Sequence, residues 1–295
     1  MILTTPILGV LALVARVSAA PSPDALLARA PPVQIKTLSA TQIAPFLNKA
    51  NAPFSPNSSL SARDSEEPSD RLTSRTIVGT DNRVLWPSPD YPYSAVGKLT
   101  FSSGPACTGT MIGRRHVATA KQCLPSLSSP WSARFAPSYY DGERLGGSNA
   151  IAVFIPNSLT PVGVCGYKED WAIIVLADPI GDTATGWFGS KQINCTAQRN
   201  IANWFHTGWP ADKGGNRPYR QEAITVTRCD ECAPGGPLET DADVLAGQTG
   251  GPLWLWENGS RYLYGMASYG AVGRNYFASG PNFYGAIGAA YSAYP

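Results

Sequence analysis

The hydrophobic positions of this chain gather in short runs rather than in long helical stripes. From Thr76 onward, runs rich in β-branched or aromatic residues are bounded by glycine, proline, asparagine or aspartate, which is the pattern of β-strands. The clearest runs are residues 151–155, 171–176, 223–227 and 252–256. No stretch has helical periodicity of convincing length, and no internal repeat is present. About 220 residues of this texture predict one all-β domain, or two β-barrels that share a core.

The first 20 residues have the pattern of an export signal. An apolar core runs from Ile2 to Val14, and the small residues at positions 17–20 suit cleavage directly after them. This core is too short for a membrane span, which takes ~20 apolar residues, and no other segment approaches that length. We therefore expect a signal peptide over residues 1–20 and a mature protein that is secreted to the extracellular space without a membrane segment.

Residues 21–75 differ in composition from the rest of the chain. They contain no Cys, Trp or Tyr, and they hold Pro-rich and polar stretches such as residues 51–59 and 65–70. A segment so poor in aromatic residues buries little surface by itself. Residues 37–51 are the one part that could form a short helix. The position of the segment, between the signal and the domain at 76–295, favours a pro-region over a disordered linker, and both interpretations stay open.

Charge and composition exclude a polyelectrolyte partner. The formal net charge is +2, and the Lys and Arg residues are scattered, without the basic stripe that nucleic-acid binding needs. Charged residues make up 15% of the chain, below the usual ~25%, whereas 29 Gly and 26 Pro exceed their average share. Low charge with many turn-forming residues agrees with short strands joined by many loops.

Six cysteines in a chain that we expect to be secreted favour structural disulfides, although six cysteines allow about fifteen connectivities. The stretch from Cys229 to Cys232 is a CxxC, which in another setting would suggest zinc or redox chemistry. The chain has no second CxxC, and its two histidines lie far from this one. A tetrahedral zinc site therefore lacks ligands, and we expect no metal and no cofactor.

Three segments, in this order, resemble the trypsin-like serine peptidases. They are residues 107–123, residues 169–176 and residues 247–252. Each is weak alone, but their order and spacing resemble this family over roughly residues 77–290, most closely its glutamyl endopeptidase (V8-like) branch. The resemblance implies two antiparallel six-stranded β-barrels followed by a short C-terminal segment.

The resemblance places two substituted residues in the catalytic triad. The first segment closes with Thr-Ala-Lys-Gln-Cys, so that Gln122 stands at the position of the family's general-base histidine. Asp170 matches the triad aspartate, and Thr249 stands where the motif Gly-x-Ser-Gly-x-Pro has its nucleophile. An amide cannot take a proton from a hydroxyl near neutral pH, and a threonine without a base is not activated. We expect Asp170 to accept hydrogen bonds from the Gln122 amide or from the backbone.

Two further positions of the expected cleft follow from the same resemblance. Gly247 and Thr249 are expected to supply the backbone N–H groups of an oxyanion hole. Ala267 stands where glutamyl endopeptidases have a histidine that helps to bind the substrate carboxylate. We therefore expect no preference for glutamate. His116 and His206, the only histidines, are not placed by any motif, and we expect structural roles for both.

The resemblance also implies a disulfide that frames position 122, and three sequons are candidate glycosylation sites. We expect bonds Cys107–Cys123, Cys165–Cys195 and Cys229–Cys232. The sequons begin at Asn57, Asn194 and Asn258, and the turn around Asn258 favours this residue as the acceptor.

The last motif is a maturation junction. Residues 74–79 (Ser-Arg-Thr-Ile-Val-Gly) resemble the site at which such proteases are cut. In the chymotrypsin-type switch, the new terminal ammonium pairs with an aspartate directly before the nucleophile. That position is Gln248 here, so no strong ion pair with a new terminus is expected.

These observations predict a secreted, monomeric pseudoprotease that binds a peptide or protein ligand in a retained cleft. The alternative is a weakly active serine-type endopeptidase of the glutamyl endopeptidase type. A third possibility is a structural or signalling function of the surface alone, because fold by itself does not fix function.

Overall fold

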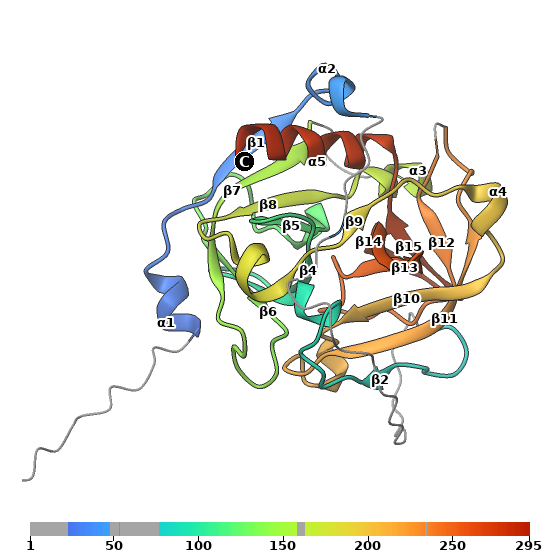
Figure 1. Ribbon diagram of the computed structural model, residues 1–295, viewed down its shortest axis with the longest axis horizontal. Helices are drawn as coiled ribbons and strands as arrows, with labels where there is room; N and C mark the ends of the chain where they lie inside the picture. The colour runs from blue at the N-terminus through green and yellow to red at the C-terminus, as the bar shows by residue number, and fades with distance from the viewer. Residues whose placement is uncertain (1–22, 48–52, 54–76, 158–162, 234) are drawn as a thin grey trace, which may run out of the picture.

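The chain forms two β-barrels that lie side by side, with a C-terminal helix across one end (Figure 1). This arrangement comes from a computed structural model that describes residues 23–47, 53, 77–157, 163–233 and 235–295. No helix in these ranges is both long and apolar enough to cross a membrane.

The first barrel is a closed antiparallel sheet in the order β7-β6-β3-β4-β5-β8, which the pairing of β7 with β8 closes. Four of its strands are fully buried along their length because both faces of the sheet are covered. The six strands are β3 (Val96–Phe101), β4 (Cys107–Met111), β5 (His116–Thr119), β6 (Ala133–Pro137), β7 (Ser148–Pro156) and β8 (Ala172–Leu176).

The second barrel has the order β10-β13-β14-β15-β12-β11, closed by the pairing of β10 with β11. Its strands are β10 (Ala202–Gly208), β11 (Tyr219–Arg228), β12 (Leu238–Thr240), β13 (Pro252–Glu257), β14 (Ser260–Ala271) and β15 (Arg274–Ala278). Two short strands extend it, β2 (Val84–Leu85) beside β11 and β9 (Gly189–Ser190) beside β14. The prediction of two six-stranded antiparallel barrels is confirmed.

The two barrels share a core, as the strand pattern suggested. Trp209, Trp254 and Met266 of the second barrel belong to the buried cluster of the first. The Trp254 ring stacks on Phe205 with the ring centroids 4.4 Å apart and meets Phe188 edge-on at 5.5 Å. Large aromatic side chains therefore fill the space between the sheets and fix how the barrels sit.

The C-terminal segment is a helix, which the hydrophobic pattern did not predict. Helix α5 spans Pro281–Ala293, and Phe283, Tyr284 and Ile287 are buried on its inner face. Two glycines and several small residues hide its periodicity, and its aromatic residues have the composition of a strand. The Tyr284 hydroxyl donates a 2.8 Å hydrogen bond to the carbonyl of Tyr264. The helix thereby joins both barrels.

The remaining helices are short. They comprise α1 (Pro23–Ala28), α2 (Ala40–Ile43), α3 (Gly163–Gly166), α4 (Cys195–Gln198) and the single turns η1 (Ala44–Phe46), η2 (Tyr93–Ala95), η3 (Lys121–Cys123), η4 (Tyr167–Glu169), η5 (Gly181–Thr185) and η6 (Ala211–Lys213).

Residues 23–47, which lie in the segment expected to be a pro-region or disordered, pack on the first barrel in the structure. They form α1, strand β1 (Gln34–Leu38), α2 and η1. Of the helix expected at 37–51, the described residues 37–47 show helical turns at 40–46, whereas residues 37 and 38 belong to the strand that pairs with β7. Residues 48–52 and 54–76, with the expected cleavage junction, lie outside the described residues, as does the expected signal at 1–20.

Of the three disulfides, one follows the expected pairing and two correct it. Cys107 and Cys123 are joined, but Cys165 pairs with Cys232 and Cys195 with Cys229. Cys229 and Cys232 are close in sequence, yet their side chains leave the loop after β11 toward two different helices. Cys229 meets α4, and Cys232 meets α3. Both thiols of the CxxC are thus consumed by structural bonds.

The two histidines are core residues. His116 is 3% exposed and packs on the Tyr291 ring at 4.5 Å, whereas His206 is fully buried and its Nδ1 lies 2.9 Å from the Pro252 carbonyl. Burial lowers the pKa of each to about 4. Both rings are therefore neutral at physiological pH.

Disulfide mapping tests the corrected connectivity. Digestion under non-reducing conditions is expected to yield peptides that join Cys165 to Cys232 and Cys195 to Cys229. In the chain-entropy model, loss of either bond would lower the free energy of unfolding by about 4 kcal/mol. The protein with both bonds reduced should therefore have a lower melting temperature. A peptide that contains a Cys229–Cys232 bond would contradict the fold of this loop.

The buried histidines predict an acid-sensitive fold. Their pKa lies near 4 when folded and near 6.5 when unfolded, so the unfolded chain binds more protons between these values. The contribution of each ring to the free energy of unfolding is fully present above pH 6.5. It is lost as the pH falls toward and below 4, by about 3 kcal/mol for each ring. Urea unfolding of the parent and of His206→Phe across this pH range measures it. The variant should lose less stability on acidification, and parallel profiles would contradict the assignment.

Candidate functional site

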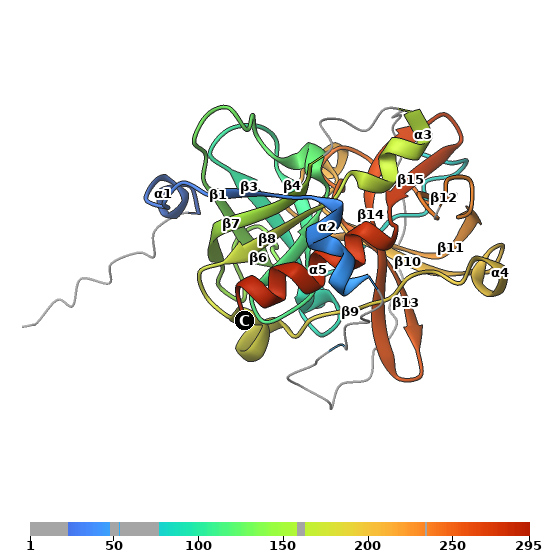
Figure 2. The ribbon, with the colours of Figure 1, turned by 90° about the horizontal axis from the view of Figure 1, so that it is seen from above.

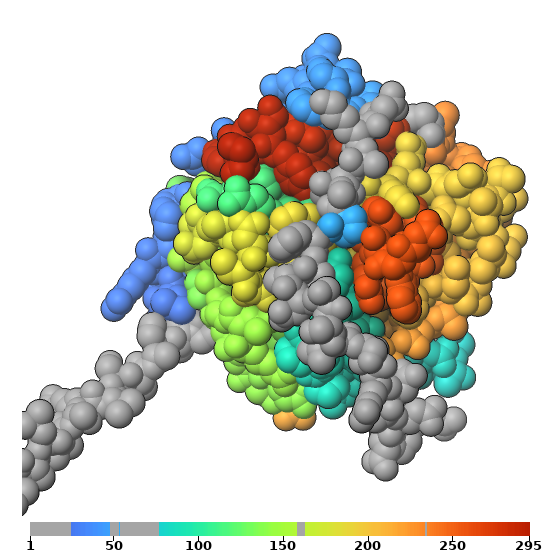
Figure 3. Space-filling model, in the orientation of Figure 1, coloured from blue at the N-terminus to red at the C-terminus, as the bar shows by residue number. Residues whose placement is uncertain are grey.

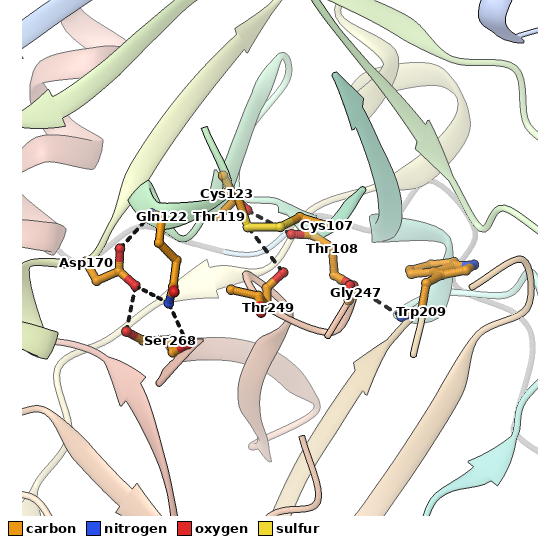
Figure 4. The surroundings of a disulfide bond; sticks show 10 residues. All are labelled: Cys107, Thr108, Thr119, Gln122, Cys123, Asp170, Trp209, Gly247, Thr249 and Ser268. Atoms are coloured by element: carbon orange, nitrogen blue, oxygen red, sulfur yellow. Dashed lines mark hydrogen bonds between the residues drawn. A yellow bond between two sulfur atoms is a disulfide. The ribbon is translucent and has the colours of Figure 1, made fainter. Parts of the chain in front are cut away.

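The three predicted triad positions meet where the two barrels join (Figure 4). Gln122 lies in η3 directly after β5, and Asp170 directly precedes β8, so neighbouring strands of the first barrel bring them together. Thr249 comes from the loop between β12 and β13 of the second barrel. The Gln122 side chain lies between the other two residues. Positions far apart in sequence thus form one cluster.

Gln122 is bonded to Asp170 through both its backbone and its side chain. Its backbone N–H donates to Asp170 Oδ1 at 2.8 Å, and its Nε2 donates to Asp170 Oδ2 at 2.7 Å. The same Nε2 donates to the Ser268 carbonyl, and the Ser268 hydroxyl donates to Asp170 Oδ2 at 2.6 Å. The sequence predicted a donor from the Gln122 amide or from the backbone, and the structure has both. Ser268, from β14, was missed, because nothing near it in sequence marks it as a partner.

Asp170 is 1% exposed, so its charge depends on these donors. Burial raises the pKa of Asp170, and the hydrogen bonds from Ser268 and Gln122, together with the nearby Lys121 charge, oppose that rise. A buried carboxylate without such donors would be strongly disfavoured. Gln122 therefore stabilises the carboxylate by supplying two N–H donors.

The loop that carries Thr249 is pressed against the first barrel. The Thr108 N–H donates to the Thr249 carbonyl at 2.9 Å, and the Thr108 hydroxyl donates to the Gly247 carbonyl at 2.8 Å. Gly250 has φ +82°, and a Cβ there would overlap the Thr119 hydroxyl and the Thr108 carbonyl. Only glycine permits this approach.

The predicted oxyanion-hole residues keep their donors available. Within the part of the chain that the structure describes, the N–H groups of Gly247 and Thr249 donate no hydrogen bond to the protein. Gly247 has φ +88°, and a Cβ at this position would overlap the Trp209 carbonyl. The backbone conformation that turns this loop therefore depends on glycine.

Ala267 lies directly behind the Thr249 loop. It is fully buried in β14, its carbonyl accepts from the Gly250 N–H at 2.7 Å, and its N–H donates to the Gly251 carbonyl at 2.8 Å. The residue that the resemblance places in the primary pocket is thus brought to the same cluster. Its methyl group provides no hydrogen-bond donor or charge.

A buried cation next to the Thr249 loop was not found from the sequence. Arg83 donates from Nη1 to the Gln248 Oε1 at 2.8 Å, and Gln248 is fully buried. Arg83 is also paired with Asp81 at 2.9 Å and with Asp212 at 2.7 Å. Burial disfavours the charge of Arg83, but these two carboxylates raise its pKa above the ordinary value. Asp81 is two residues away, but Asp212 and Gln248 are 129 and 165 residues away, so no local pattern could reveal this cluster.

The other candidate residues lie elsewhere. His116 and His206 are buried inside their barrels, as described above, and neither takes part in the hydrogen bonds around Asp170. Asn258 is exposed in the turn between β13 and β14, and it remains the predicted acceptor. Asn194 uses its side chain to cap α4 through Ala197, and Asn57 lies outside the described residues.

Solved structures confirm the fold. A Glu endopeptidase in complex with MPD superposes with a TM-score of 0.59 at 20% identity, over 72% of this chain and 98% of that one. The protease Anisep from Arthrobacter nicotinovorans gives a TM-score of 0.54 at 20% identity, over 68% and 98%. Human heparin binding protein gives 0.52 at 19% identity, over 73% and 98%. At such low identities the likeness concerns the fold alone.

Sequence comparison is more specific. A glutamyl endopeptidase of Bacillus licheniformis is 28% identical over 186 residues, which are 61% of this chain and 55% of the relative. The chain thus spans about half the length of that relative. The Trypsin family model matches residues 86–290, which include all three triad positions and both barrels. This chain therefore belongs to the trypsin family, has the serine endopeptidase fold, and is related to a glutamyl endopeptidase.

Proposed function

We propose that this protein is a secreted, catalytically inactive homologue of serine endopeptidases that binds a peptide or protein segment in its cleft. The observation that carries the proposal is the hydrogen bonding of Gln122. Its Nε2 donates to Asp170 and to the Ser268 carbonyl, in the place where a general base would need a free basic nitrogen. The one other polar atom of this side chain is the amide oxygen, which is too weak a base to accept a hydroxyl proton near neutral pH.

The residue at the nucleophile position supports the same conclusion. A threonine hydroxyl becomes nucleophilic when a base removes its proton, and among the residues that the structure describes no basic side chain is hydrogen-bonded to the Thr249 hydroxyl. In serine proteases the base and the nucleophile act as a unit, and loss of either one costs on the order of a millionfold in turnover. The rate that an oxyanion hole and binding retain alone is only ~10³–10⁴ above water, which does not sustain a protease.

Binding of a peptide needs neither a general base nor a nucleophile. The N–H groups of Gly247 and Thr249 are available to a ligand carbonyl, and their loop is fixed by Thr108. Beside them, Tyr269 is 47% exposed and stacks on Tyr167 at 4.6 Å, so that an aromatic surface borders the site. These features suit an extended peptide.

The alternative is a weakly active serine-type endopeptidase, favoured by the 28% identity to a glutamyl endopeptidase. The disulfide-bonded fold supports secretion in either case.

An activity assay separates the two functions. The purified protein should hydrolyse neither casein nor a panel of fluorogenic peptides, and a fluorophosphonate probe should not label Thr249, because no base activates this hydroxyl. Thr249→Ala serves as the matched control and should be indistinguishable from the parent. Turnover that Thr249→Ala abolishes would establish an active endopeptidase instead.

Restoring both groups tests whether the cleft still has the geometry of a protease. Gln122→His with Thr249→Ser should give weak hydrolysis, about a hundredfold or more below an active protease because small displacements are costly, while neither single variant gains activity. Adding Asp170→Asn should remove the gain. No preference for glutamate is expected with Ala267 in the pocket.

Far-UV circular dichroism and melting temperature should first show that these variants fold. A folded double variant without measurable hydrolysis would mean that the cleft has diverged as well as the triad. Activity in Gln122→His alone would mean that Thr249 is a competent nucleophile and would overturn the inactive assignment.

A further inference from the structure

We propose that residues 23–47 are a permanent part of the folded protein, held in a socket that the first barrel and α5 form for them. On this proposal the segment stays bound, without a covalent link, when the chain is cut between residues 47 and 77. It is not a pro-region that leaves on maturation. The inference does not depend on the proposed function.

The segment adds a strand to the first barrel. β1 pairs in parallel with β7 over five residues, from Gln34 opposite Ala152 to Leu38 opposite Pro156. Hydrogen bonds continue the contact at both ends, from the Val33 N–H to the Trp131 carbonyl and from the Asn157 N–H to the Leu38 carbonyl. β6 pairs with β7 only at Ser148 and Asn149, so β1 covers backbone groups of β7 that lie beyond this pairing.

Apolar side chains of the segment enter the core of the barrel. Val33, Leu38 and Ile43 are at most 8% exposed and belong to the same buried cluster as the strands of the first barrel. Lys36 adds a cation–π contact, with its Nζ 4.9 Å from the centre of the Tyr294 ring. Removal of the segment would uncover these apolar surfaces to water.

Two glycines of helix α5 make room for side chains of the segment. Gly285 and Gly288 lie on one face of the helix, three residues apart, and the segment packs on that face. A Cβ at Gly285 would overlap Ile43, and one at Gly288 would lie 2.7 Å from Phe46 Cβ. Glycine is among the least favourable residues in a helix interior. Two glycines at these points admit two side chains that belong to the supposed pro-region.

The socket lies apart from the cluster of Gln122, Asp170 and Thr249. Figure 1 and Figure 2 show α2 over α5, with β1 beside β7, and Figure 3 shows this segment packed against the helix on the surface. The contacts named above involve none of the cluster residues Gln122, Asp170 and Thr249. The segment therefore supports the barrel at a place apart from these three residues.

The test uses the full-length protein, cut after it has folded. A recognition sequence for a site-specific protease is placed between residues 53 and 77, and the cut protein is passed through a size-exclusion column. All six cysteines lie at position 107 or later, so no disulfide can hold the two pieces together. We expect both fragments in one peak at equal amounts, and separation only in denaturant. Separation in native buffer would overturn the proposal.

Matched variants test the socket itself. Ile43→Asp should reduce the retained fragment at least tenfold after cutting, whereas Ala44→Asp, at an exposed neighbouring position, should retain it. Gly288→Leu, which favours the helix but fills the socket, should also release the fragment. Circular dichroism of the uncut proteins checks their folding. Equal retention in all variants would show that the contact is not the one described. If Ile43→Asp fails to fold uncut while Ala44→Asp folds, the segment is still shown to be integral.

Discussion

The close approach of the Thr249 loop to the first barrel is the constraint on which the site depends. Thr108 holds this loop through two hydrogen bonds, and Gly250 has no side chain to keep the loop and β5 apart. The Cys107–Cys123 bond fixes the strand and the turn on the opposing side (Figure 4). The Thr249 loop and the turn that carries Gln122 are therefore held by contacts that need neither a base nor a nucleophile, so their arrangement does not depend on the reacting groups.

The base position illustrates how such a change can be tolerated. A buried aspartate must be given hydrogen-bond donors or its charge becomes costly. Gln122 provides two N–H groups to Asp170 and is itself satisfied by the Ser268 carbonyl. Glutamine can thus keep the buried polar network complete while providing no proton acceptor. Stability and catalysis place different demands on this position, and only the second requires histidine.

The sequence predicted what is local and missed what is assembled by the fold. The strands at 151–155 and 171–176 were predicted correctly because β-branched residues and flanking turns mark them. The family motifs pointed to Gln122, Asp170 and Thr249, which the fold brings together, and their assignment to a triad stays a prediction. The partners of Cys229 and Cys232 depend on where α3 and α4 lie in space, which spacing does not encode. Helix α5 was missed because its two glycines, which receive side chains of another segment, weaken the helical pattern.

Arg83 and the N-terminal segment together change how maturation of this chain is understood. The chymotrypsin-type switch brings a new terminal ammonium to the residue before the nucleophile. Here the corresponding Gln248 already accepts a hydrogen bond from Arg83, whose charge two carboxylates hold in place. Asp243 meanwhile accepts the N–H groups of Val78 and Asn82, which fixes the start of the domain. A new terminus near residue 76 would therefore meet a Gln248 side chain that already accepts a hydrogen bond from Arg83, and no carboxylate stands at that position to pair with an ammonium group. The loop that carries Thr249 is held by Thr108 without such a terminus.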